Sequence, residues 1–191
     1  MNRKALLLIT LLVEGGLFVF GLLLIGGSGP ALTRLSLSWG ATGYALLLST
    51  PMFAALYFAM RLDWRPLTQL RDELDEKVMP IFANCEIVDL AIIAFLAGTG
   101  EELFFRGWLQ GALSSKIDVV SGILIASVIF GIAHYLSLTY AMYAGLTGIY
   151  LGVIYQASGN LYIVMGIHAL YDFFALIYLV RRGKEKTSEL N

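Results

Sequence analysis

Two adjacent glutamates and an arginine interrupt an apolar stretch of this chain. Glu101 and Glu102 follow Gly98-Thr99-Gly100, and Arg106 comes four residues after Glu102. Residues four apart share a helical face, so Glu102 and Arg106 are predicted to form an ion pair. Glu101 points about 100° away, which leaves its carboxylate free to act as a general base. Taken alone, these residues also fit a purely structural ionic cluster.

The chain has two histidines, and each also lies in an apolar stretch. His134 comes four residues after Phe130, so a helix puts the aromatic ring and the imidazole on one face. His168 and Asp172 have the same spacing, and the carboxylate can accept the ring proton of His168 and orient the imidazole. A lone buried histidine is more often a packed core residue than a catalyst. Glutamates, histidines and an aspartate gathered from three places are hard to explain by packing.

The composition is that of a membrane protein with many lipid-facing side chains. Of the 191 residues, 58% are apolar and 14% are charged, whereas soluble domains average about 45–50% and about 25%. The net charge is −1 and no basic run is present, so nucleic acid is not an expected partner. The single cysteine, Cys85, forms no intrachain disulfide and is interpreted as a small buried residue. Because lipid cannot satisfy free backbone groups, the spans must be helical, and we predict an all-α, polytopic membrane helical bundle.

Six apolar segments predict about six transmembrane helices, each near the length of about 20 residues that crosses a bilayer. They cover roughly 5–25, 43–60, 86–113, 119–138, 139–156 and 161–180. We predict a single membrane domain, 1–191, with two N-terminal spans in 1–60, a charged cytoplasmic or interfacial linker in 61–80, and core spans in 86–180 that carry the motifs. Glu14, inside the first span, is interpreted as an acid facing a polar neighbour, with substrate handling as the alternative.

Lysine and arginine predict the orientation in the membrane. They gather before the first span, after the second and after the sixth (Arg3, Lys4, Arg61, Arg65, Arg71, Lys77, Arg181, Arg182, Lys184 and Lys186). The positive-inside rule then places both termini in the cytoplasm. We predict a multi-pass integral protein of the plasma (inner) membrane. In the fifth span, Gly148 and Gly152 are four apart and predict a close approach between helices.

The three motifs resemble those of the CPBP family of intramembrane proteases, also called the Abi or CAAX-protease-and-bacteriocin-processing family. Glu101-Glu102-Leu-Phe-Phe-Arg106 is similar to its EExxxR motif, Phe130-Gly-Ile-Ala-His134 to FxxxH, and His168-Ala-Leu-Tyr-Asp172 to HxxxN or HxxxD. The resemblance spans about Phe95–Phe174 and implies a helical membrane fold with a site between the core helices. It implies an endopeptidase that acts on membrane-associated, CAAX-type or bacteriocin-like substrates. The expected catalytic residues are Glu101, His134, His168 and Asp172, supported by Glu102, Arg106 and Phe130.

Two mechanisms fit these residues. In the first, no cofactor is required: Glu101 takes a proton from water that His134 positions, while His168 and residue 172 stabilise the oxyanion. In the second, His134, His168 and Asp172 hold Zn²⁺, which would make the protein a metalloprotease. The chain has no HExxH motif, so a conventional zincin is excluded. An ionised Asp172 repels an oxyanion, whereas a protonated one donates to it, and we favour attack by Glu-activated water.

Two other classes of protein were weighed against the enzyme. A non-catalytic bacteriocin immunity or interaction protein would keep the fold and the polar cluster, but the intact motifs favour catalysis. A small transporter would use the carboxylates and imidazoles as a proton or cation relay, but the sequence shows no inverted repeat. The expected partners are the lipid bilayer and a peptide or protein substrate.

Overall fold

The structure, a computed structural model, describes residues 2–26 and 35–189. Within these residues all regular structure is helical, which confirms the predicted all-α bundle. In chain order the elements are α1 (Arg3–Gly26), α2 (Trp39–Arg61), α3 (Arg65–Glu73), the π-helix η2 (Leu74–Val78), α4 (Met79–Phe82), α5 (Ile87–Glu102), the π-helix η3 (Leu103–Gln110), α6 (Gly111–Lys116), α7 (Val119–Ala133), α8 (Leu138–Ser158) and α9 (Leu161–Glu189).

Four helices in the described part of the chain, α1, α2, α8 and α9, are long and apolar enough to cross a membrane. A bent pair, 65–82 with 87–116, turns by 110° and adds a fifth span if counted as one. Length and composition therefore give four or five spans, compared with the six predicted segments. One reason is that α7 has only 15 residues and ends before His134, its C-cap residue. The other is that 87–116 meets the criterion only together with the charged linker.

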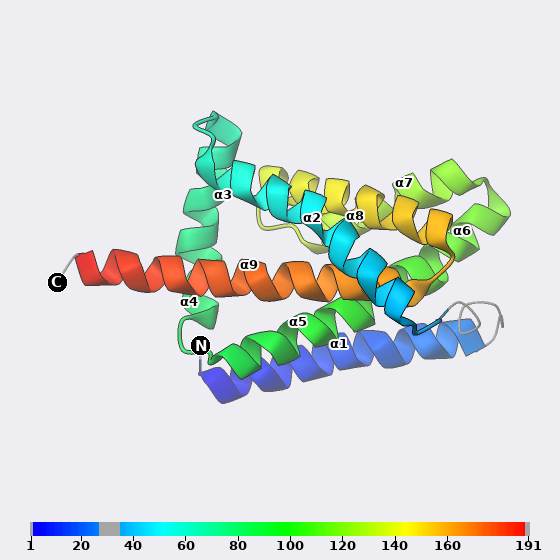
Figure 1. Ribbon diagram of the computed structural model, residues 1–191, viewed down its shortest axis with the longest axis horizontal. Helices are drawn as coiled ribbons and strands as arrows, with labels where there is room; N and C mark the ends of the chain where they lie inside the picture. Colours follow the sequence, from blue (N-terminus) through cyan, green and yellow to red (C-terminus); the bar gives the residue numbers. More distant parts are fainter. Residues whose placement is uncertain (1, 27–34, 190–191) are drawn as a thin grey trace.

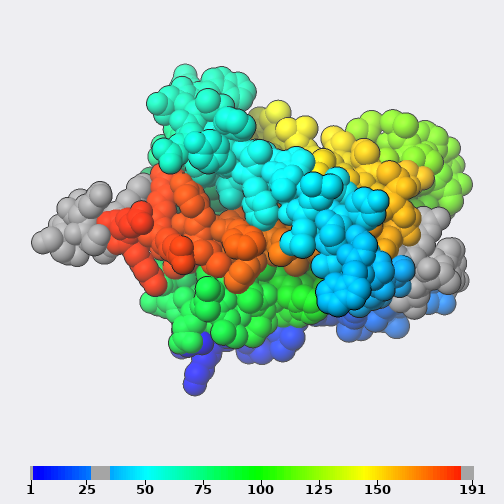
Figure 2. All heavy atoms as spheres, in the orientation of Figure 1, coloured from blue at the N-terminus to red at the C-terminus, as the bar shows by residue number. Residues whose placement is uncertain are grey.

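The long helices run roughly along one axis, and the linker crosses one end of them. Figure 1 shows α3 and α4 lying across the end where α1 begins and α9 ends. Within the bundle, α5 packs against both α1 and α9, α2 packs against α9, and α7 packs against α8. Figure 2 shows α9, in orange and red, between α2 and α5 on this face of the molecule. The motif-bearing helices are therefore held together by direct contacts.

Side-chain caps fix the starts of α7 and α8, and a glycine ends α8. Asp118 caps the start of α7 by accepting the N–H of Ser121, and Ser137 caps the start of α8 by accepting that of Tyr140. Gly159 ends α8 in the left-handed region at φ 61°, a conformation that glycine adopts at little cost. The capped start of α8 lies three residues after His134, so the turn that follows this imidazole has a defined course.

A backbone-level contact brings α5 against α9 beside the predicted site. A Cβ added at Gly98 would lie 2.7 Å from the backbone nitrogen of Ala169, closer than real Cβ atoms come. Glycine therefore lets the two backbones touch next to His168, as small residues do in membrane helix pairs. This contact brings Glu101 and Glu102 within reach of α9.

The glycines of α8 receive polar side chains from η3. Arg106 Nη2 donates to the carbonyl oxygen of Gly148 at 3.0 Å, and Gln110 Nε2 donates to that of Gly152 at 3.0 Å. A Cβ at Gly148 would lie 3.1 Å from the side chain of Ser127 on α7. The predicted close approach at these glycines is present, and the buried side chains of Arg106 and Gln110 bind the backbone of α8 there.

Candidate active site

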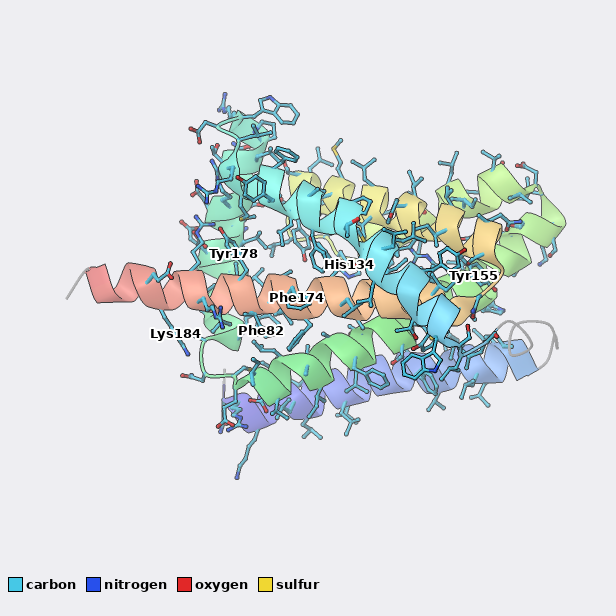
Figure 3. The ribbon with its side chains drawn as sticks, viewed as in Figure 1. Phe82, His134, Tyr155, Phe174, Tyr178 and Lys184 are labelled. Carbon is cyan, nitrogen blue, oxygen red and sulfur yellow. The ribbon has the colours of Figure 1, made fainter. Side chains whose placement is uncertain are left out.

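The three motifs meet at the carboxylate of Glu101. Its Oε2 lies 3.5 Å from Nε2 of His134 and 4.0 Å from Nε2 of His168. Glu101 is 8% exposed and His168 4%, while the side chain of His134 keeps 28% of its surface exposed. Figure 3 shows His134 in the body of the bundle, away from both of its ends. The end of α5, the end of α7 and the middle of α9 thus each contribute one side chain to the same point.

The imidazole of His134 is held in one orientation by Phe130. Its Nδ1 lies 2.9 Å from the carbonyl oxygen of Phe130, which can only accept, so Nδ1 carries the proton and donates. The two rings stack with centroids 4.4 Å apart. Nε2 is therefore the nitrogen that faces Glu101. The sequence spacing predicted that these two rings share a face, and they do.

His168 lies between two carboxylates. Nδ1 is 2.8 Å from Oε1 of Glu102, and Nε2 is 3.4 Å from Oδ2 of Asp172. The spacing suggested Asp172 as the group that orients this imidazole, but the shorter contact is to Glu102. Asp172 is the more exposed of the two acids, with 30% of its side chain accessible. Sequence reasoning missed the pairing of Glu102 with His168, because it is a contact between two helices.

Glu102 and Arg106 form the expected ion pair, fully inside the protein. Arg106 Nη1 lies 3.1 Å from Oε1 of Glu102, and the two residues are 1% and 0% exposed. The guanidinium carbon also lies 4.7 Å from the ring centroid of Phe130. A buried pair needs such additional contacts to offset the cost of removing two charges from water. Arg106 thereby links the EExxxR motif to the FxxxH motif through Phe130.

The EExxxR motif lies across the junction of two helix types. Glu102 is the last residue of α5, and Arg106 lies in the eight-residue π-helix η3. π-Helical turns are rare and occur frequently at functional sites, where the wider turn shifts side chains relative to an α-helix. The sequence predicts an uninterrupted span here, and no residue pattern in it signals the change.

A cavity of about 260 Å³ opens beside the two imidazoles. Its polar side chains are those of His134, His168, Asp172, Thr147, Tyr140, Tyr143, Tyr171 and Tyr178. Apolar side chains from α2, the linker and α9 form the rest, among them Leu56, Met60, Leu70, Leu74, Leu176 and Leu179. The four tyrosines did not stand out in the sequence, although Tyr140 and Tyr143 are spaced for one helical face and Tyr171 precedes Asp172. A molecule in this cavity would contact both imidazoles.

Glu14 approaches the site from α1. A Cβ at Gly100 would lie 2.5 Å from the carbonyl oxygen of Glu14, so α1 touches α5 at the residue before Glu101. Within the described residues, Oε2 of Glu14 is buried without a hydrogen-bond partner. The charges that act on this carboxyl include those of Glu101 and both histidines. The expectation that Glu14 faces a polar neighbour, like its role in substrate handling, stays a prediction.

The donor set expected for zinc does not form a metal site. Among the described residues, no group of three or more His, Cys, Asp and Glu side chains is arranged to hold a metal ion. The residues proposed as ligands, His134, His168 and Asp172, thus do not fit a zinc ion, and a metalloprotease is not supported.

The fold and the site together define an integral membrane protein of the intramembrane endopeptidase class. Residues 83–174 match the family model described as Rce1-like, type II CAAX prenyl endopeptidase. The match contains all three motifs, so it confirms the resemblance drawn from them and indicates a CAAX-protease-type endopeptidase. Comparisons with curated proteins and with solved structures gave no significant match.

Proposed function

We propose that the protein hydrolyses a peptide bond of a membrane-associated substrate with water activated by Glu101. The observation that supports this most strongly is the position of Glu101 Oε2, 3.5 Å from His134 Nε2 and 4.0 Å from His168 Nε2. This oxygen is buried and has no hydrogen-bond partner among the described residues. A carboxylate oxygen so placed can accept a proton from a water molecule that the two imidazoles also contact.

The proposed reaction starts in the cavity beside the imidazoles. Water loses a proton to Glu101 as its oxygen attacks the scissile carbonyl carbon, and His134 Nε2 positions that water. His168, held by Glu102, stabilises the oxyanion from Nε2 when this nitrogen is protonated. The C–N bond then breaks, and the leaving amine takes the proton back from Glu101. General base catalysis typically contributes about 10²–10⁴-fold, and one oxyanion donor about 10²–10³-fold.

We further propose a CAAX-type prenylated protein as the substrate. The family match supports this class, and a bacteriocin-like peptide is the second candidate. The wall of the cavity is largely apolar, which suits a substrate that arrives from the lipid phase. The proposed mechanism requires no cofactor.

The arrangement of the ends supports a cytoplasmic placement of both termini in the plasma (inner) membrane. In Figure 1 the start of α1 and the end of α9 lie at the same end of the bundle, and the linker helices α3 and α4 lie there too. This end carries most of the lysines and arginines, which the positive-inside rule assigns to the cytoplasm. We propose that residues 1–191 form one membrane domain, with the linker 61–80 at its cytoplasmic surface.

The test is a comparison of protein termini in membranes that contain wild type, Glu101→Ala or His134→Ala protein. We expect new termini with the wild type only, with all three proteins present in equal amounts. New termini that are equally abundant with Glu101→Ala would reject hydrolysis. If no membrane protein acquires a new terminus with the wild type, the non-catalytic immunity or interaction role replaces this proposal.

A further inference from the structure

We propose that Tyr140 is a further catalytic residue, whose hydroxyl donates a hydrogen bond to the scissile carbonyl oxygen as it becomes an oxyanion. This inference rests on the proposed function, because it assigns a role within that hydrolysis. Tyr140 lies near the start of α8, where its backbone N–H donates to Oγ of Ser137 at 3.2 Å. The residue is six positions after His134, across the capped turn between α7 and α8.

The side chain of Tyr140 faces the reacting groups. It lines the same cavity as His134, His168 and Asp172. Tyr140 is partly buried, and among the described residues its hydroxyl makes no hydrogen bond. It is therefore available to donate to a substrate.

In the proposed mechanism Nε2 of His168 is one donor to the oxyanion, and a second donor remains to be assigned. An ionised Asp172 accepts hydrogen bonds but donates none, and it repels developing negative charge. Nδ1 of His134 already donates to Phe130, and Nδ1 of His168 faces Glu102. A neutral phenol at Tyr140 donates without a change of charge, and it would offset the unfavourable effect of Asp172.

Other hydroxyls in the cavity are less suited to this role. Tyr143 and Tyr171 bind each other, with their oxygens 2.8 Å apart, so one of their two protons is used within the pair. Thr147 lies seven residues beyond Tyr140, or about 10 Å along α8. Tyr178 lies six residues beyond Asp172, or about 9 Å along α9, and is 42% exposed. Tyr140 thus combines a hydroxyl without a hydrogen bond among the described residues with a place on the cavity wall that also holds the imidazoles.

The experiment compares Tyr140→Phe with Tyr155→Phe, a control that removes one hydroxyl from α8 at a residue that does not line the cavity. Both variants keep the ring, so we expect melting temperatures in detergent close to that of the wild type. Purified wild type, both variants and Glu101→Ala are reconstituted in liposomes with an internally quenched peptide that carries a farnesylated CAAX terminus. In parallel, new protein termini are quantified in native membranes that contain each protein, which covers a substrate of another type.

Tyr140→Phe is expected to lower kcat about 10²-fold with little change in KM, the loss typical of one oxyanion donor. Tyr155→Phe is expected to stay within about threefold of wild type in both constants. Full activity of Tyr140→Phe alongside an inactive Glu101→Ala would overturn this inference and leave the proposed function standing. An effect on KM alone, or an equal loss in both tyrosine variants, would also overturn it. If neither assay shows cleavage that depends on Glu101, the inference and the proposed function fail together.

Discussion

Nδ1 of His168 lies 2.8 Å from Oε1 of Glu102, the same oxygen that Arg106 approaches at 3.1 Å. One carboxylate thereby connects the ion pair of the first motif to the imidazole of the third. Glu102 is fully buried, so this junction is shielded from water and its electrostatic interactions are strong. The second glutamate of the motif orients a histidine as well as neutralising an arginine.

Glu102→Gln is expected to destabilise the fold as well as the site. The substitution leaves Arg106 as a buried cation without its partner, and breaking a buried ion pair in this way costs about 3–5 kcal/mol. The free energy of unfolding in detergent measures the loss. The double variant Glu102→Gln/Arg106→Met removes both charges, so it should recover much of the stability and remain inactive. A single variant as stable as wild type would contradict this assignment.

Asp172→Asn and Asp172→Ala separate the possible roles of this acid. An amide donates a hydrogen bond and does not repel an oxyanion, so we expect Asp172→Asn to be at least as active as wild type. Asp172→Ala removes the group 3.4 Å from His168 Nε2 and should lower kcat roughly tenfold. Steady-state kinetics in liposomes measure both effects. Loss of activity in Asp172→Asn with full activity in Asp172→Ala would refute this reasoning.

Gly98→Leu should separate α5 from α9 and disrupt the site. A Cβ at this position would already lie 2.7 Å from the Ala169 backbone nitrogen, so the helices must move apart. A misplacement of about 1 Å can cost about 10²-fold in rate, and overpacking typically costs about 1–3 kcal/mol. Gly16→Leu is the control, because a Cβ there would meet nothing within 4 Å. Cleavage assays and melting temperatures should show an effect for Gly98→Leu only.

Chelation tests the choice between the two mechanisms. Among the described residues the imidazoles and carboxylates form no group arranged to hold a metal ion, so activity is expected to persist after treatment with 1,10-phenanthroline. Zinc analysis of the purified protein accompanies the assay. Loss of activity on chelation, restored by added Zn²⁺, would favour the zinc mechanism over attack by Glu-activated water.

The sequence predicts interactions within one helix better than contacts between helices. The Glu102–Arg106 pair and the stacking of Phe130 on His134 follow from a spacing of four residues, and both are present. The contact of Glu102 with His168 depends on how α5 packs on α9. Helical periodicity carries no information about that packing, so the contact was not foreseen.

Helix ends and helix type show the same limit. The segment 119–138 is apolar throughout, which hides the end of α7 at Ala133, although Ser137 is a recognisable cap. The π-helix η3 continues directly from α5, and no residue pattern in the sequence marks its wider turns. The charges after Val180 predicted the end of a span, whereas α9 continues as a helix to Glu189.

The most direct test of the central claim is the rate of peptide cleavage in liposomes by wild type and Glu101→Gln. The amide keeps the size of the side chain but cannot take a proton from water, and a matching melting temperature would show that the fold is intact. We predict that kcat falls at least about 10³-fold, within the range that a general base supplies. A Glu101→Gln protein that cleaves within about tenfold of the wild-type rate would contradict water activation by Glu101.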